Sequence, residues 1–221
     1  MRVGRGSWGL VSFGLKSCGL IGLLSVSLAR QARAAEDPPV PEPPATRRSG
    51  FTLGIASGLS ISSASGYPND VTQIDVPGLE ASTGTGASVG TAFWVGGALA
   101  DWLTIALGLQ RGSFSGNGLD AAGNSLHVRI EAFPLFFRGG AWQDAGLSVF
   151  AGTGNYDVKR GDVTVAEGEG TSLVGLGAFF EPWQFWQLST GPDLTYTHQF
   201  SRSLSAHSLV IGWRLAFYGG P

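Results

Sequence analysis

The sequence predicts an all-β fold, an eight-stranded antiparallel up-and-down barrel, and three observations lead to it. Large apolar residues recur at every second position over segments of about ten residues, which is the period of a β-strand. Glycine supplies 35 of the 221 residues and charged side chains only 14%, a composition that excludes a disordered chain. Outside the N-terminal region, no apolar run approaches the roughly 18 residues of a membrane-spanning helix. The apolar residues are therefore distributed in short segments.

Residues 1–34 have the form of a cleaved secretory signal peptide. They contain basic but no acidic residues, an apolar stretch at Ser17–Ala29 and a small-x-small site at Ala32–Ala34. The apolar stretch is short for a bilayer core of about 30 Å, which disfavours a retained anchor. Cleavage would remove Cys18, the only cysteine, and would leave nine basic against 16 acidic residues, a formal charge of −7 in place of −2.

Residues 35–49 form a predicted proline-rich periplasmic spacer. The segment Glu36–Arg48 contains five prolines in 13 residues, which favours an extended polyproline conformation and prevents pairing in a sheet. We therefore expect the barrel domain to cover residues 50–221.

The strands follow in order from Gly50, and four of them alternate clearly. Phe51, Leu53 and Ile55 alternate with small residues, and the pattern continues to Ile61. Three further segments, which begin at Leu103, begin at Leu126 and end near Phe217, alternate in the same way. The other four predicted strands are less regular. The eight predicted strands are 51–61, 88–99, 103–110, 126–133, 146–155, 171–181, 188–198 and 208–218.

The links between these segments alternate in length. Because consecutive antiparallel strands are joined at opposite ends of a barrel, alternation predicts four long outer loops at one end and three short periplasmic turns at the other. The expected short turns are Ala100–Trp102, Gly139–Ala145 and Pro182–Gln187. The expected long loops are Ser63–Gly86, Ser113–Ser125, Tyr156–Gly170 and Gln199–Ala206.

The composition of the two strand faces favours a transmembrane barrel over a soluble one. The less apolar face carries glycine, alanine and isolated charges, which suits a narrow interior, whereas a soluble barrel would have a wet outer face rich in Lys and Glu. Tryptophans at the predicted short turns suit an aromatic girdle at one membrane boundary. These girdle residues are Trp102, Trp142, Trp183 and Trp186. A soluble, lipocalin-like periplasmic binder is the alternative.

The segment VIGWRLAF, Val210–Phe217, carries a resemblance to a known family. Gly212, Leu215 and Phe217 match the C-terminal assembly signal of small eight-stranded outer-membrane barrels of OmpA/OmpX type, although Val210 stands where a polar residue is usual. The chain also continues past the aromatic residue that usually ends the signal. The resemblance implies an outer-membrane location, contacts with outer-membrane lipids and lipopolysaccharide, and insertion by the barrel-assembly machinery. We expect a monomer.

A predicted ion-pair network fills the lumen, because eight strands enclose little more than their own side chains. Arg129, Glu131, Asp193 and Arg214 fall on the inward face, and charges there need partners. Gln110 and His127 are candidates for the edges of this network. Its role is either structural neutralisation or a gate or proton path.

The sequence predicts a non-enzymatic protein that acts through surface loops or as a structural or interaction protein of the envelope. A net charge of −2 provides no basic footprint for nucleic acid, and no cofactor or metal motif is evident. His127, His198 and His207 are expected to be surface residues; His207 and Ser208 are adjacent and so point to opposite faces. The alternative is a lipid-modifying enzyme of lipid A acylase or deacylase type.

Overall fold

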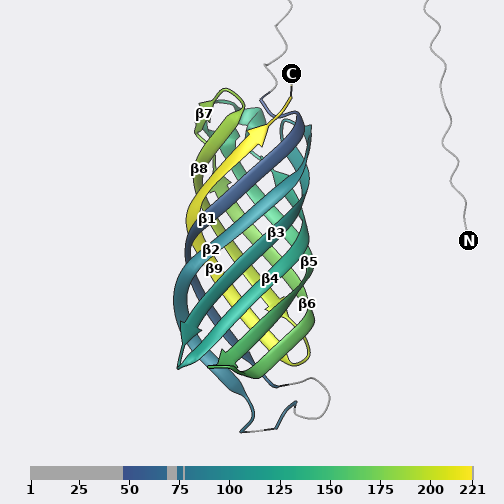
Figure 1. Cartoon of the computed structure of the whole chain (residues 1–221). Helices are drawn as coiled ribbons and strands as arrows, with labels where there is room; N and C mark the ends of the chain where they lie inside the picture. Colours follow the sequence, from purple (N-terminus) through teal and green to yellow (C-terminus); the bar gives the residue numbers. More distant parts are fainter. Residues whose placement is uncertain (1–46, 69–73, 77, 221) are drawn as a thin grey trace, which may run out of the picture. The chain divides into compact units, whose positions relative to one another are not determined.

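The computed structural model describes residues 47–68, 74–76 and 78–220, and within them eight long strands form a closed barrel (Figure 1). The predicted signal peptide and most of the spacer lie outside the described residues. A short additional strand, β7, occurs in the link between β6 and β8. The strands are β1 Gly50–Gly66, β2 Ala81–Ala100, β3 Leu103–Gly116, β4 Leu119–Ala132, β5 Ala145–Arg160, β6 Val163–Phe180, β7 Trp183–Phe185, β8 Leu188–Phe200 and β9 Leu204–Tyr218.

Each long strand pairs antiparallel with its neighbours in the chain, and two pairings close the ring. β1 pairs with β9 from Thr52–Tyr218 to Gly66–Leu204, and β6 pairs with β8 from Ser172–Phe200 to Phe179–Asp193. The order β1-β2-β3-β4-β5-β6-β8-β9 then returns to β1. This confirms the predicted eight-stranded up-and-down barrel.

The lengths of the links differ from those predicted. At the terminal end, where the described chain begins and ends, residues 101–102 join β2 to β3. Two short 3-10 helices, η2 Phe136–Arg138 and η3 Gly140–Asp144, lie between β4 and β5. At the opposite, distal end only 67–80 is long; 117–118, 161–162 and 201–203 are tight turns.

Three predicted long loops were therefore wrong. Ser113–Ser125, Tyr156–Gly170 and Gln199–Ala206 lie mostly in β-strands. The strands run further toward the distal end than the apolar alternation indicated, so that three connections shrink to hairpin turns.

The outer surface carries a continuous apolar band. In β1, exposed apolar residues recur from Phe51 to Ile61, and β3 and β4 contribute Leu107, Leu109 and Val128 among others. The ten residue steps from Phe51 to Ile61, at about 3.3 Å each and tilted by about 40°, give a band of about 25 Å, the height of the apolar belt on outer-membrane barrels.

Beyond this band the polarity of the two faces inverts. Within the band, β4 turns Leu126 and Val128 outward and Arg129 inward, whereas near the distal turn it turns Leu119 inward and Asp120 outward. Lys159 and Val158 of β5 follow the inverted pattern too. A strand in lipid must turn its apolar face outward, and a strand in water must turn it inward. This inversion explains why the distal residues have the composition of loops but form strands.

Glycine makes room for large side chains in the lumen. Gly54 is the cross-strand partner of Trp94, and a Cβ at Gly54 would lie 2.1 Å from the indole ring. The partner of His127 is Gly108, where a Cβ would lie 2.2 Å from the imidazole. Three more such pairs are Gly123 with Tyr156, Gly146 with Phe179 and Gly175 with Phe150. Much of the high glycine content thus serves to fill a narrow barrel with rings.

Candidate functional site

The terminal half of the lumen is filled by a buried network of arginines and carboxylates. Glu131 is its centre: Arg129 Nε donates to its Oε1 at 2.7 Å, and Arg214 donates to both of its oxygens at 3.0 Å. All three side chains are at most 2% exposed. A bidentate arginine–carboxylate pair is a strong and directional contact, which holds β4 and β9 together across the lumen.

The network continues toward the terminal end through Glu181, in the link after β6. Arg214 Nε lies 2.9 Å from Glu181 Oε1, and the Tyr218 hydroxyl donates to Glu181 Oε2 at 3.0 Å. Sequence reasoning did not name Glu181, although it is the last residue of the predicted strand 171–181. The signal was available, since Glu181 continues the inward alternation of Gly177 and Phe179.

Arg48 closes the terminal end of the network. Its Nη2 donates to Asp144 Oδ1 at 2.8 Å, its backbone N–H donates to Asp101 Oδ1 at 2.7 Å, and its guanidinium lies 3.6 Å above the Phe133 ring. The side chain is completely buried. The folded barrel therefore includes Arg48, which the sequence analysis assigned to the spacer of residues 35–49.

Trp94 seals the lumen beside this network. The guanidinium groups of Arg129 and Arg214 each lie 4.7 Å from its ring centroid, and Trp94 is 1% exposed. Such cation–π contacts stabilise a desolvated arginine beyond its ion pairs. The indole and the two guanidinium groups thus lie together, buried inside the lumen.

Asp193, the fourth predicted member, lies inside the lumen but apart from the other three. Its Oδ1 accepts from Thr195 Oγ1 at 2.8 Å, and within the described residues no ion pair joins it to Arg214. Asp193 and Arg129 instead line one small cavity of about 20 Å³ with Gln110. Asp193 and Arg214 lie on neighbouring strands of the β8–β9 hairpin, but the register places Gly212 opposite Asp193 and Gly191 opposite Arg214.

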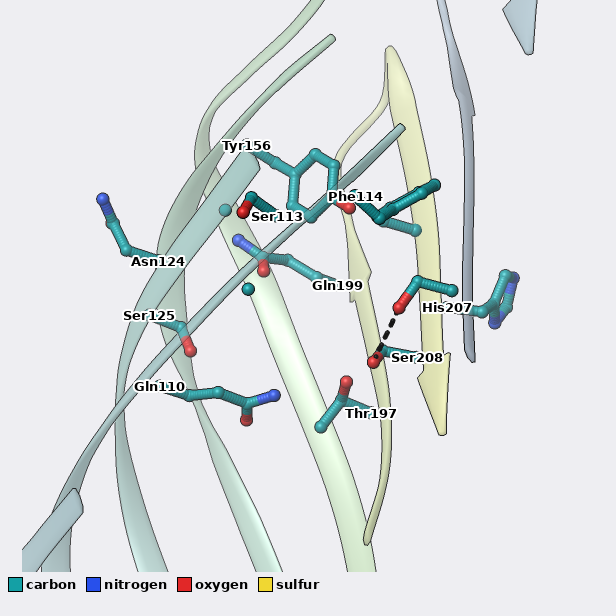
Figure 2. Close-up of a pocket in the computed structure, with 14 residues that line it drawn as sticks. Gln110, Ser113, Phe114, Asn124, Ser125, Tyr156, Thr197, Gln199, His207 and Ser208 are labelled. Atoms are coloured by element: carbon teal, nitrogen blue, oxygen red, sulfur yellow. Dashed lines mark hydrogen bonds between the residues drawn. The ribbon is translucent and has the colours of Figure 1, made fainter. Parts of the chain in front are cut away.

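A polar chamber of about 40 Å³ lies on the distal side of Asp193 (Figure 2). The side chains of Gln110, Gln199 and Ser208 point into it, whereas Asn124 and His207 point away. On one wall Ser62 Oγ donates to Oγ of its cross-strand partner Ser208 at 3.0 Å, and Gln199 contacts Thr171. A water needs about 10–15 Å³, so the chamber suits a few waters and is too small for a sugar or a nucleotide.

An apolar cluster closes the distal end of the lumen. Its members include Phe114, Leu119, Tyr156, Val158 and Leu204, and all of these are at most 9% exposed. The polar chamber therefore lies between an apolar plug and the charged, aromatic network. Side chains occupy the lumen on both sides of the chamber.

His127 corrects one prediction. It was expected at the surface, although it was also a candidate for the edge of the lumen network; it is 3% exposed, inside the lumen, with its ring 4.7 Å from that of Phe150. Its inward position follows from the alternation that places Arg129 inside. His198 and His207 do lie on the outer face.

The aromatic residues predicted for the girdle surround the terminal end. Trp102, Trp142, Trp183 and Trp186 all lie in or beside its links and are 41% to 88% exposed. Trp213 of β9, which sequence analysis did not include, stacks on Trp183 at 5.3 Å. An indole favours the boundary between apolar and wet surroundings.

The residues of the predicted assembly signal lie on β9 where it closes the ring. Gly212 is opposite Gly58, and a Cβ at Gly212 would meet the Ser57 carbonyl oxygen at 2.3 Å. Leu215 points outward and is 41% exposed, and Phe217 contacts Trp186 at the terminal end. Where β9 pairs with β1, the two backbones therefore approach closely at Gly58 and Gly212, and apolar side chains on either side of this point face outward.

One cluster with catalytic residue types lies on the outer face, just distal to the apolar band. Ser205 Oγ is 3.1 Å from His198 Nε2 and 3.3 Å from His207 Nε2, and the two imidazoles stack at 4.3 Å. The Tyr196 hydroxyl lies 2.8 Å from His207 Nδ1, the position that a carboxylate holds in a serine triad. Sequence analysis missed Ser205 because it lies across the β8–β9 hairpin from His198.

Among the described residues, no His, Cys, Asp or Glu side chains group in a way that could hold a metal ion. No helix in that part of the chain is long and apolar enough to cross a membrane.

The geometry defines a class: a closed eight-stranded barrel with an apolar exterior and a filled lumen. Comparison with solved structures gave similar folds at low sequence identity. Neisserial surface protein A has 13% identity and a TM-score of 0.48, with 76% of this chain and 97% of that chain covered. Ail, the attachment invasion locus protein of Yersinia pestis, has 11% identity and a TM-score of 0.47, with 76% and 99% covered.

The outer membrane protein OprG from Pseudomonas aeruginosa has 11% identity and a TM-score of 0.41, with 78% of this chain and 98% of that chain covered. A second structure of Ail contains the heparin analogue sucrose octasulfate. No family model and no curated protein matches the sequence.

Proposed function

We propose that the protein is an integral outer-membrane barrel that does not conduct solutes and acts at the cell surface through its distal end. The observation that carries this proposal is the combination of an apolar band on the outside with a lumen filled by ion pairs and rings. A soluble barrel would bury its apolar face, and a pore would leave its lumen open. The terminal end, with its tryptophans, then faces the periplasm.

The distal strands support a surface role. They extend the barrel beyond the apolar band, are held by the apolar cluster inside and present charged side chains outside. The rigid surface they form suits a structural or interaction protein better than mobile loops would. Its outward charges include Asp120, Asp157, Lys159, Arg160, Asp162, Glu169 and Arg202.

Fractionation and conductance test this proposal together. We expect the protein in the outer-membrane fraction, with a gel mobility in detergent that changes on heating, and no ion current across a planar bilayer that contains it. A general porin in the same bilayer is the positive control. Recovery in the soluble periplasm would overturn the membrane location, and stepwise current from the wild-type protein would overturn the closed lumen.

The Ser205 cluster supports a second candidate function, a lipid ester hydrolase. An imidazole within hydrogen-bond reach of a serine hydroxyl is the minimum for an activated nucleophile, and its place just beyond the apolar band is the depth of lipid ester groups. In this candidate Ser205 Oγ attacks the ester carbonyl, and His198 accepts the hydroxyl proton and passes it to the leaving alkoxide. Water then hydrolyses the acyl-enzyme and releases the fatty acid.

Acyl release from lipopolysaccharide decides between the two candidates. If the first is correct, purified wild-type protein and the Ser205→Ala variant release no fatty acid. Release by the wild type that the Ser205→Ala variant abolishes, and that the neighbouring outward variant Ser63→Ala keeps, would establish the hydrolase instead.

A further inference from the structure

An amphipathic groove crosses the outer face of the barrel over β2, β3, β4 and β5. It has a volume of about 570 Å³, and its lining divides into an apolar and a polar row. Phe93, Leu109 and Leu126 are cross-strand partners in the apolar row, all exposed. The polar row joins Thr91, Arg111, Asn124 and Asn155 in the same way, one outward position closer to the distal end.

The groove spans the edge of the apolar band. Leu109 and Leu126 are the last large apolar residues that face outward on β3 and β4, and Arg111 and Asn124 occupy the next outward positions toward the distal end. The same groove therefore offers an apolar floor on its terminal side and hydrogen-bond donors on its distal side. An occupant that satisfies both rows is an amphiphile with its polar group toward the distal end.

The positive charge in the polar row favours an anionic ligand. Arg111 is its only ionised member, and it forms no ion pair with any carboxylate in the described part of the chain. The side-chain carbonyl of Asn155 accepts from the Gly170 N–H at 3.2 Å, which leaves the Asn155 amide N–H groups available as donors. A guanidinium beside amide donors matches the oxygens of a phosphate group.

We propose that this groove binds a phosphate-bearing lipid of the outer leaflet. Arg111 holds the phosphate with Asn124 and Asn155, and the acyl chains lie on Phe93, Leu109 and Leu126. This inference rests on the proposed function, since it needs the apolar band to lie in a membrane. It adds a partner of defined chemistry and a defined place on the barrel.

Lipid retention by the folded barrel in detergent, measured by native mass spectrometry, tests the proposal. The probes are lipid A and the same lipid A without its phosphate groups. We expect the wild type to retain phosphorylated lipid A at least about tenfold better than the dephosphorylated form, because a charge-assisted bidentate contact is lost. We expect Arg111→Ala to lose this preference and Arg111→Lys to keep part of it.

Arg160→Ala is the matched control, since it removes one exposed cation at the distal end of β5, away from the groove, and should retain lipid as the wild type does. Equal retention of the two lipids by the wild type, or an undiminished preference in Arg111→Ala, would overturn the proposal. Insertion into vesicles is measured in parallel. A barrel that inserts but has no phosphate preference refutes only the lipid site, whereas one that fails to insert refutes the proposed function.

Discussion

Trp94 shows how single residues determine the lumen. Its indole lies 4.7 Å from each of two buried guanidinium groups and beside Gly54, where a Cβ would come within 2.1 Å of the ring. Both guanidinium groups are in turn held by hydrogen bonds to Glu131. Much of the high glycine content is thus explained by single glycines that lie opposite a large inward side chain on the adjacent strand.

We expect Gly54→Ala to lower the free energy of unfolding by about 1–3 kcal/mol, the typical cost of overpacking. Urea unfolding followed by tryptophan fluorescence would measure the change. Gly112→Ala is the matched control, because nothing lies within 4 Å of a Cβ there, and it should change stability by less than about 0.5 kcal/mol. Equal effects of the two substitutions would contradict the role of Gly54.

Glu131→Gln should be among the most destabilising single changes. It leaves Arg129 and Arg214 buried without their shared carboxylate, and breaking a buried pair costs about 3–5 kcal/mol. The same unfolding assay checks this expectation, with the exposed Glu169→Gln as a control that should have little effect. Wild-type stability in the Glu131→Gln variant would mean that the network does not hold the lumen.

Alternation in the sequence was enough to place Arg129, Glu131, Asp193 and Arg214 inside the barrel, because a strand fixes which face each residue occupies. It could not choose their partners. Arg214 contacts Glu131 rather than Asp193 because contacts across the lumen depend on the stagger of strands far apart in the chain. Arg48 was missed since it lies just outside the predicted strands, whereas Glu181 ends the predicted strand 171–181 and was not recognised as an inward charge.

At the scale of strands, the inversion of polarity divides each hairpin into two parts. The part in the band has apolar side chains outside and ion pairs inside, and the distal part has an apolar core of its own around Val158. The sequence pattern predicted strands only where large apolar residues faced outward. The distal parts carry the opposite pattern with many small and acidic residues, which is why they were predicted as loops.

Val158→Asp should open the distal part of β5 and β6 and leave the band intact, because it buries a carboxylate in the apolar cluster. Hydrogen exchange read by mass spectrometry would show fast amide exchange near residues 156–166 and unchanged protection at 145–151. Thr164→Asp, at an exposed position of the same hairpin, should not alter exchange. Loss of protection throughout β5 would mean that the two parts are a single cooperative unit.

At the scale of the whole molecule, the fold follows directly from the sequence. Four clear apolar alternations, four less regular ones, a low charge and turn-side tryptophans were enough to predict a closed barrel, since closure leaves the amphipathic strands without a free edge. Whether the apolar face of each strand points outward or inward depends on whether lipid or water surrounds the barrel. This dependence is therefore open to a direct test.

We expect Leu107→Arg to reduce the stability of the barrel in lipid vesicles by about 2–4 kcal/mol, the cost of an arginine near the bilayer midplane. Ser113→Arg, on the same face of β3 but beyond the band, should have little effect. Denaturant titration in vesicles measures both. Equal tolerance of the two arginines would indicate that the apolar face does not lie in lipid.

The position of Arg48 also has a consequence for the order of assembly. This residue precedes the first strand, yet its guanidinium contacts the link after β4, the link after β6 and the ring of Tyr218 on the last strand. These groups come together only after β9 has paired with β1. Before closure, the contacts of Arg48 therefore contribute little to the stability of the sheet. The ion pairs thus stabilise the closed barrel relative to partly closed forms. We expect Arg48→Ala to let partly closed forms accumulate, visible as intermediate bands on unheated gels during refolding.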